Sequence, residues 1–327
     1  MTSFLISRAR VAALSAALAF AVYAIAGGPA AYAQDTVRIA LPTKTYYPTI
    51  ISETALRQGL FAKEGLKAEL TVYRGGAEAF EAVAAGAADF TVGSIAIVAG
   101  GIKKGVKTKA VAGAGLGYYG WYLMTKAGSP IKSVKDLEGK KVGITSAGSA
   151  TDILARWTQA EKKVNFTRVP LGGGGLVPNL LSGNVEAIVL YSPLSFKVLK
   201  DKSVNVLVDF GKEVPEHLSG VWIVSEKLIN EKPQVVQKAV NALFGGIAVL
   251  NSDRDTAVKL IAEIDELTPE IAAAELDGNI KKLSKTGEMQ KVWVERAFGM
   301  AKLVGMSDLA GIDEVYTTKF KAVPTKK

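Results

Sequence analysis

The sequence contains no cysteine, and this absence removes several kinds of chemistry at once. Disulfide frameworks, thiolate zinc sites, iron–sulfur clusters and cysteine nucleophiles all need sulfur ligands or thiolates. Histidine is almost as scarce, because His217 is the only one in the chain. A Ser-His-Asp triad can therefore form around one position only, and a metal site made of several histidines cannot form. These absences count against a hydrolase or a metalloenzyme.

Long apolar runs are also missing from the chain after its N-terminal region. No segment there reaches the ~20 uninterrupted apolar residues of a membrane-spanning helix. The remaining composition is that of an ordinary folded protein, with 49% hydrophobic and 22% charged residues, 33 glycines and 11 prolines. The 327 residues exceed the roughly 250–300 residues that one hydrophobic core usually serves. We therefore expect two lobes.

The N-terminal region has the organisation of a secretory signal peptide. Arg8 and Arg10 precede an apolar run over Val11–Ala26, and Ala31-Tyr-Ala33 provides a small-residue cleavage pattern. We predict cleavage after Ala33, which makes residues 1–33 the signal peptide and the mature protein periplasmic. A membrane anchor is disfavoured because the run is shorter than a spanning helix. A lipoprotein is excluded because no cysteine is available for acylation.

Positive charge is in excess, with a formal net charge of +9, but the lysines are scattered. Local clusters occur over residues 103–109 and 140–141, and no aromatic residues alternate with them as a nucleic-acid surface would require. We interpret the clusters as solvated faces. No nucleic-acid partner is expected.

Short β-like runs alternate with helix-length segments, in an order that predicts two mainly parallel sheets. The first set has strands over Val37–Leu41, Lys67–Tyr73 and Asp89–Val92, with helices over Pro48–Gln58 and Ala77–Ala85. The second set has strands over Lys141–Thr145, Phe166–Leu171 and Glu186–Leu190, with helices over Thr151–Glu161 and Leu176–Leu181. From Val221 onward the chain is expected to be mostly helical and to pack on one lobe.

The two sets also share a spaced sequence pattern. Gly75-Gly76, nine residues, Gly86, two residues and Asp89 correspond to Gly172-Gly173, nine residues, Gly183, two residues and Glu186. Three glycines and an acid in register, within the same order of elements, indicate related construction. We therefore predict two α/β lobes built on the same plan.

A glycine pattern over Gly115–Gly120 formally matches the dinucleotide-binding motif. That motif needs a helix directly after the glycines, so that the helix N-terminus faces the pyrophosphate. Here the following Trp121–Thr125 is β-prone. We interpret the segment as a connection whose aromatic residues can form walls for a small molecule.

The segment Ser146–Asp152 lies between a predicted strand and a predicted helix. Ser149 and Asp152 fit a capping box, so a purely structural cap is one interpretation. The other is a ligand site, because amides and hydroxyls at a helix start favour anionic or hydrogen-bond-accepting groups. A carboxylate at Asp152 would repel a bare anion unless it points away or pairs with a cationic group of the ligand.

Other candidate residues follow predicted strands, at the sheet edge where open α/β sheets bind ligands. Glycines over 75–76 and 172–175 occupy strand-to-helix turns, where backbone amides can approach a ligand closely. Tyr46, Tyr47, Ser94 and Tyr191 fall just beyond strand ends. His217 has no acid or serine at a telling spacing, so a surface or cleft-edge histidine is favoured over a catalytic one.

Taken in order, several phrases resemble the periplasmic solute-binding proteins of ABC importers, in the nitrate/sulfonate/taurine and thiamine-precursor group, an SsuA/THI5-like domain. These phrases are Pro48-Thr49-Ile50, Gly59 to Leu66, Gly75-Gly76 to Asp89, Asp136 to Gly143, and Gly172-Gly173 to Glu186-Ala187. The resemblance covers nearly all of residues 35–305. It is specific to the family and not to a ligand.

The resemblance implies a type II periplasmic binding protein fold in which the chain crosses twice between the lobes, near Ala127 and near Gly220. Lobe 1 would comprise 34–127 and 220–327, and lobe 2 would comprise 128–219. The family's ligand-contacting loops place the following residues at the cleft: Thr43, Lys44, Tyr46, Gly75, Gly76, Ser94, Tyr119, Trp121, Ser146, Gly148, Ser149, Thr151, Gly173 and Tyr191.

By this resemblance the protein binds a small organic acid, sulfonate- or taurine-like or a nitrate-like anion, and delivers it to the membrane permease of an ABC importer by cleft closure. Aromatic residues would cover the apolar body of the ligand, with amides, hydroxyls and Lys44 at its polar end. Neither catalysis nor a cofactor or metal is expected, and the protein is expected to be a monomer. Enzymes of the family that make a pyrimidine precursor depend on a cysteine-rich segment, which this chain lacks.

Three alternatives remain open from the sequence. The same fold can bind a neutral pyrimidine or thiamine precursor stacked on Tyr46 or Trp121. An exported enzyme can use His217. A ligand-sensing subunit of a signalling receptor would share the binding physics of a transport protein.

Overall fold

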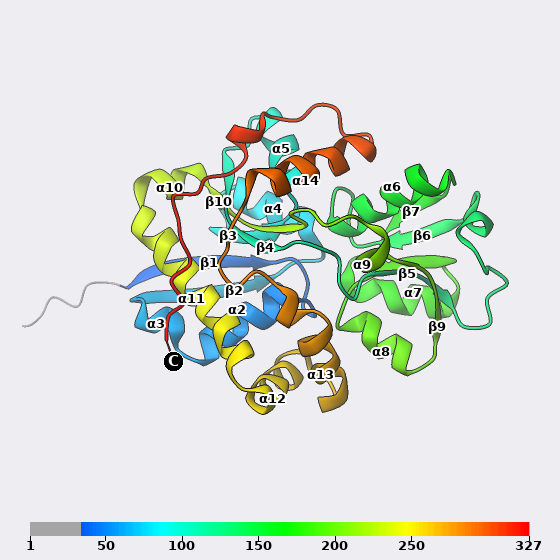
Figure 1. The fold of residues 1–327 in the computed structure, drawn as a ribbon, viewed down its shortest axis with the longest axis horizontal. Coiled ribbons are helices and arrows are strands. Elements are labelled where there is room, and N and C mark those ends of the chain that lie inside the picture. The colour runs from blue at the N-terminus through cyan, green and yellow to red at the C-terminus, as the bar shows by residue number, and fades with distance from the viewer. Residues whose placement is uncertain (1–33, 327) are drawn as a thin grey trace, which may run out of the picture. The chain divides into compact units, whose positions relative to one another are not determined.

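Two five-stranded sheets organise residues 34–326, the part of the chain that the computed structural model describes (Figure 1). The predicted signal peptide lies outside the described residues. The strand order of the first sheet is β2-β1-β3-β10-β4, and that of the second is β7-β6-β8-β5-β9. Each sheet with its helices is called a lobe below, the first lobe and the second lobe.

The first sheet contains four strands that run in one direction and one that runs against them. Strand β1 pairs in parallel with β2 and β3, whereas β10 is antiparallel to β3 and β4. The strands are β1 (Asp35–Leu41), β2 (Leu66–Val72), β3 (Phe90–Gly93), β4 (Thr108–Gly115) and β10 (Gly220–Ser225).

Helices cover both faces of the first sheet, and the alternation of side chains along β10 shows which helices cover which face. Trp222 and Val224 belong to a core that includes α2 and α11, whereas Val221 and Ile223 belong to a second core with α5 and α14. The helices of this lobe are α2 (Tyr47–Arg57), α3 (Leu60–Lys63), α4 (Gly76–Ala84), α5 (Ile95–Lys103), α10 (Glu226–Glu231), α11 (Pro233–Ser252), α12 (Arg254–Asp265), α13 (Pro269–Gly278) and α14 (Lys291–Leu303).

The second sheet repeats this plan. Strand β6 pairs in parallel with β7 and β8, and β5 is antiparallel to β8 and β9. All four residues of β8 are buried, as expected for a central strand with both faces covered. The elements are β5 (Tyr122–Lys126), β6 (Lys141–Ile144), β7 (Thr167–Pro170), β8 (Ala187–Leu190), β9 (Val204–Asp209), α6 (Ala150–Lys162), α7 (Leu176–Ser182), α8 (Leu194–Lys200) and α9 (Phe210–Glu213).

The spaced pattern shared by the two lobes has the same structural role in each. The Asp89 carboxylate accepts a hydrogen bond from the backbone N–H of Arg38 in β1 at 2.8 Å. The Glu186 carboxylate accepts one from the backbone N–H of Lys141 in β6 at 2.9 Å. In both lobes the acid therefore ties the turn before the third strand to the backbone of the first strand, which agrees with the predicted repeat.

The chain passes between the sheets at two places, and the first differs from the expected position. Tyr122 already pairs with Leu190 and Asp209 of the second sheet. The first passage therefore lies over residues 116–121, before the crossing expected near Ala127, because β5 is itself a strand of the second lobe. The return lies between β9 and Gly220, the first residue of β10.

Among residues 34–326, no helix combines the length and apolar character needed to cross a lipid bilayer.

Candidate functional site

A small cavity lies where loops of the first and second lobes meet. Its volume is about 50 Å³, and one water needs about 10–15 Å³ by the same measure. The cleft is therefore nearly shut in this conformation. The lining residues are Pro42, Thr43, Tyr46, Gly76, Val92, Gly93, Ser94, Ile97, Trp121, Thr145, Gly148, Ser149, Ala150, Thr151, Tyr191, Ser219 and Gly220.

Most of the site residues predicted from the sequence line this cavity. They come from the ends of strands in both lobes, as the topological argument requires. The predicted residues that line it are Thr43, Tyr46, Gly76, Ser94, Trp121, Gly148, Ser149, Thr151 and Tyr191. Those outside the lining are Lys44, Gly75, Tyr119, Ser146 and Gly173.

Two of the residues outside the lining are engaged elsewhere. The Lys44 ammonium lies 2.7 Å from the Glu266 carboxylate, and both side chains are exposed. The Tyr119 hydroxyl donates to Glu216 at 2.7 Å, and the Lys282 ammonium lies 4.5 Å from the centre of the Tyr119 ring. Neither residue is part of the cavity lining.

The other predicted residues outside the lining form direct contacts between the lobes. The N–H of Gly173 in the second lobe donates to the Arg74 carbonyl of the first at 2.9 Å. A Cβ atom at Gly173 would lie 2.6 Å from both Thr43 Cγ2 and the Tyr191 hydroxyl. A Cβ atom at Gly75 would lie 2.5 Å from Ser146 Oγ. Glycine at these two positions therefore lets the lobes close.

Three aromatic rings from the two lobes meet at the cavity. The ring centres of Tyr46 and Tyr191 are 5.1 Å apart, those of Trp121 and Tyr191 are 5.2 Å apart, and those of Tyr46 and Trp121 are 5.7 Å apart. These separations fall in the range of favourable aromatic pairs. The rings give the cavity an apolar wall and join the first lobe to the second.

The N-termini of four helices border the cavity. They belong to α2, α4, α5 and α6, whose N-cap residues are Tyr46, Gly75, Ser94 and Ser149. Neither α2 nor α4 has a side-chain hydrogen bond at its cap. A helix N-terminus carries about half an elementary positive charge. Among the described lining residues, no side chain is acidic, basic or histidine, so these helix ends supply the positive potential.

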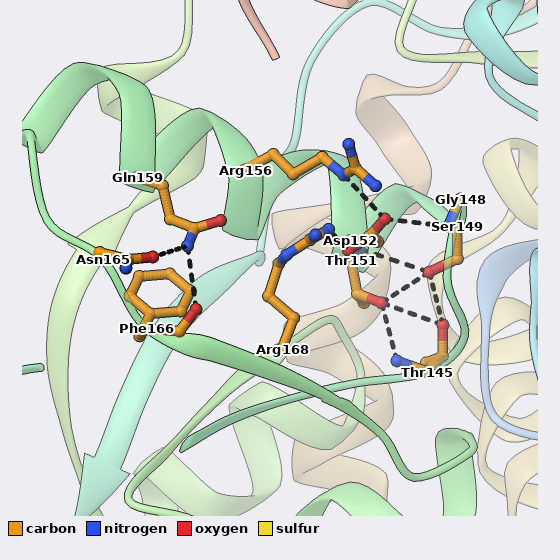
Figure 2. Close-up of polar contacts among 10 residues, drawn as sticks. All are labelled: Thr145, Gly148, Ser149, Thr151, Asp152, Arg156, Gln159, Asn165, Phe166 and Arg168. Atoms are coloured by element: carbon orange, nitrogen blue, oxygen red, sulfur yellow. Dashed lines mark hydrogen bonds and ion pairs between the residues drawn. The ribbon is translucent and has the colours of Figure 1, made fainter. Parts of the chain in front are cut away.

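Hydroxyl groups at the start of α6 form a small network (Figure 2). The Thr145 hydroxyl donates to Ser149 Oγ at 2.9 Å, and Thr151 Oγ1 lies 2.8 Å from Ser149 Oγ. Thr151 Oγ1 also accepts from the backbone N–H of Thr145 at 2.8 Å. The network fixes the loop between β6 and α6, with hydroxyls and amides facing the cavity wall.

The negative charge of the Asp152 carboxylate, in the first turn of α6, is compensated by neighbouring cationic side chains. Its side chain is 1% exposed and forms ion pairs with Arg168 of β7 and with Arg156, the latter at 3.1 Å (Figure 2). It also accepts from the backbone N–H of Gly148 at 2.9 Å. Two guanidinium groups thus neutralise one carboxylate. The cluster is positive overall and does not repel an anion at the start of α6.

Thr43 Oγ1 and the Tyr191 hydroxyl line the cavity, and both are buried. Neither forms a hydrogen bond of standard geometry with the described residues, although Thr43 lies close enough to Tyr191 to lower its pKa in part. Burial raises the pKa of Tyr191 to about 12, so the phenol stays protonated and can donate. Buried polar groups are usually paired, so these hydroxyls are candidates for ligand contacts.

The sequence analysis missed several lining residues, including Thr145, Ser219 and Gly220. Ser219 and Gly220 begin β10 on its return to the first sheet, and the Ser219 hydroxyl donates to the Gly117 carbonyl at 3.0 Å. The sequence predicts a crossing at Gly220. A segment that crosses between two lobes is expected to pass beside the cleft between them. This expectation could have identified both residues from the sequence.

His217 lies outside the cavity and lacks the partners of a catalytic base. Its Nδ1 lies 2.8 Å from the Pro215 carbonyl, and its ring packs 5.5 Å from that of Tyr118. Burial lowers its pKa, which favours the neutral imidazole. The imidazole lines a separate pocket with Glu213, Glu216 and Arg296, and no carboxylate or serine hydroxyl among the described residues is hydrogen-bonded to it.

Comparison with known proteins places the chain in a family. Residues 50–257 match the family described as NMT1/THI5 like. The chain belongs to this family. This NMT1/THI5-like protein is 25% identical over 203 residues to a binding protein of Brucella abortus (strain 2308), across 60% of this chain and 61% of the relative. The alignment thus spans less than two thirds of that curated relative.

Solved structures show the same fold. The alkanesulfonate-binding protein SsuA from Xanthomonas axonopodis pv. citri, bound to MOPS, has a TM-score of 0.74 at 17% identity, over 86% of this chain and 98% of that one. The periplasmic aliphatic sulphonate binding protein SsuA from Escherichia coli has a TM-score of 0.70 at 18% identity, over 90% and 94%. These likenesses confirm the predicted two-lobed periplasmic binding protein fold.

An enzyme shares this fold as well. The desulfurization enzyme DszB has a TM-score of 0.59 at 18% identity, over 87% of this chain and 97% of that one. The fold by itself therefore does not decide between binding and catalysis, and the residues at the site have to decide.

Proposed function

We propose that this protein is an extracytoplasmic solute-binding protein that encloses a small organic anion of the sulfonate type between its lobes. Closure of the cleft would then present the loaded protein to the membrane permease of an ABC importer. The lobes would comprise 34–121 and 220–326 on one side and 122–219 on the other, which moves the first boundary from 127 to the passage after β4.

The observation that carries this proposal is the set of four helix N-termini around a cavity whose lining has no charged side chain. Backbone N–H groups at helix starts bind sulfonate, phosphate or carboxylate groups directly. Free donors at Thr43 and Tyr191 add hydrogen bonds, and the aromatic wall suits a short apolar body. A cationic ligand would find no carboxylate in this lining.

Binding without catalysis is favoured by what the cavity lining provides. Nucleophilic catalysis by a hydroxyl needs an adjacent general base, and the one histidine lies outside the lining with its Nδ1 at the Pro215 carbonyl. The lining offers hydroxyls, amides and tyrosines. These groups bind and orient a ligand.

The ligand class can be tested by thermal unfolding with ethanesulfonate, taurine, nitrate, sulfate and a hydroxymethylpyrimidine. A ligand at a hundred times its Kd stabilises the native state by about 2.7 kcal/mol, which raises the Tm of a protein this size by roughly 5 °C or more. We expect this shift with the organic sulfonates. A shift with the pyrimidine alone would overturn the proposal in favour of a neutral ligand.

Closure can be tested with a matched pair of adjacent glycines. Gly173→Ala places a methyl group against Thr43 and Tyr191, whereas a Cβ atom at Gly174 has nothing within 4 Å. We expect Gly173→Ala to weaken ethanesulfonate binding at least tenfold in calorimetry, and Gly174→Ala to change it less than about twofold. Equal affinities in the two variants would contradict cleft closure at Gly173.

A further inference from the structure

Two carboxyl groups are buried outside the cavity, and neither forms an ion pair with a lysine or arginine among residues 34–326. Glu275 in α13 is 0% exposed, and Asp265 at the end of α12 is 6% exposed. Both carboxylate oxygens of Asp265 and Oε2 of Glu275 lack a hydrogen-bond partner among the described residues. The other Glu275 oxygen accepts from Asn279 Nδ2 at 2.8 Å. Because a buried ionised carboxylate without partners is very costly, these groups persist as neutral acids.

The two acids lie where the first lobe touches the second. Helix α13 of the first lobe packs on α8 of the second. A Cβ atom at Gly278 would lie 2.7 Å from Phe196, and Glu270 pairs with Lys200 across the same contact. Ser192, which precedes α8, lies close enough to Glu275 to lower its pKa in part. If the lobes part, this contact opens and water reaches Glu275.

The charges around the pair do not favour ionisation. Asp265 faces Glu275, Glu266 and Glu53, and its one cationic neighbour among the described residues is Lys44, which is bound to Glu266. Burial, together with the negative charge of Glu275, raises the pKa of Asp265 to about 8. Burial also raises the pKa of Glu275 to about 8, with Ser192 and Asn279 offsetting part of the rise.

Most of the remaining charges on the packed elements are paired. On α8, Lys200 is bound to Glu270, and Lys197 is exposed and is not among the groups that shift the pKa of Glu275. On the exposed side of α13, Asp277 pairs with Arg254 and Lys281 at 2.8 and 2.7 Å. Tyr191, on the second-lobe side, is protonated and carries no charge. No described neighbour therefore supplies a free positive charge to the pair.

We propose that closure of the cleft takes up protons, because Glu275, together with Asp265, has to be neutral where α13 meets the second lobe. This inference rests on the proposed function, in which the lobes close over a ligand, and it makes that closure dependent on pH. In the open protein an exposed glutamate ionises above about pH 4.3. In the closed protein it stays protonated up to about pH 8. Closure is therefore favoured in acidic medium and disfavoured as pH rises through this window.

The test is a small-angle scattering titration of the ligand-free protein from pH 5.5 to 9. For one proton taken up, the ratio of closed to open protein falls up to about tenfold per pH unit, so the radius of gyration should rise with pH. The double variant Asp265→Asn/Glu275→Gln cannot ionise at either position and should stay compact across the range, whereas Glu275→Gln alone should respond less to pH than the wild type. The control is Asp277→Asn, two residues along the same helix and exposed, which should follow the wild type.

Either of two results would overturn the inference: a wild-type radius that does not change with pH, or the same pH response in Glu275→Gln as in the wild type. Because this titration uses no ligand, it is independent of the ligand panel above. If no sulfonate raises the Tm, that result would count against the proposed function. It would not affect the pH dependence of the radius of gyration.

Discussion

The two lobes contain buried carboxyl groups that are stabilised in opposite ways. Asp152 in the second lobe is 1% exposed, and its charge is met by two arginines and a backbone N–H. Glu275 in the first lobe is 0% exposed, and one of its oxygens has no partner. The charge of Asp152 is therefore compensated at the start of α6, whereas Glu275 has no cationic partner among the described residues.

This difference separates two functions that acidic residues can serve in a binding protein. A paired carboxylate fixes structure, because breaking one partner leaves a buried charge. An unpaired one makes its surroundings sensitive to pH, because its protonation is linked to burial. Asp152 fixes the start of α6 beside the cavity, and Glu275 lies in the helix of the first lobe that packs on α8 of the second.

The largest effect should come from removing the arginine that pairs with Asp152 from the neighbouring strand. Arg168→Met leaves the carboxylate buried with only the half-exposed Arg156, and we expect a loss of about 3 kcal/mol in the free energy of unfolding. Urea denaturation at pH 7 measures it. Arg156→Met is the matched control and should cost about 0.5 kcal/mol, because its i,i+4 pair is more exposed. Similar small losses in both variants would show that Asp152 does not depend on Arg168.

A smaller and opposite effect is expected at Glu275. Its raised pKa means that the native state holds a proton that the unfolded chain releases above about pH 4.3. Wild-type stability is therefore lost as pH rises from there towards about 8. Glu275→Gln does not titrate, so its stability relative to the wild type should rise steadily from pH 5 to pH 8, by up to about 1.4 kcal/mol per pH unit. Urea denaturation across this range measures the difference in the free energy of unfolding. A difference that is constant at all pH values would contradict the claim that Glu275 is protonated in the native protein.

Local sequence patterns were enough to predict most elements, and the reason is visible in the repeat. The runs over 37–41, 141–145 and 186–190 combine β-branched residues with flanking turn signals, and these local features indicate a strand before its pairing partners are known. The spaced glycines and acids predicted the shared plan because Asp89 and Glu186 have the same backbone partner in each lobe. The crossing near 127 was misplaced because the β5 strand pairs only with distant segments.

The cavity residues that lie at strand ends could be predicted, because the sheet topology places them together. The charge balance around the cavity could not, because it depends on contacts between residues far apart in the sequence. Strand ends in an open α/β sheet meet at one edge, so Thr43, Ser94 and Tyr191 could be placed together. No spacing in the sequence pairs Asp152 with Arg168, or brings α13 against α8. The charge balance of the site, which decides between an anionic and a cationic ligand, arises from such pairs.

Lys44 provides the smallest predicted effect and tests the one cation that the sequence assigned to the ligand. Its ammonium binds Glu266 on the surface and does not line the cavity. Exposed pairs contribute little to stability, so Lys44→Met should leave the urea midpoint unchanged. Ethanesulfonate affinity, measured by calorimetry, should change less than about twofold at low salt, because the screened charge lies outside the cavity. A tenfold loss would mean that Lys44 turns into the cleft when a ligand is bound, and that the helix N-termini do not carry the anion alone.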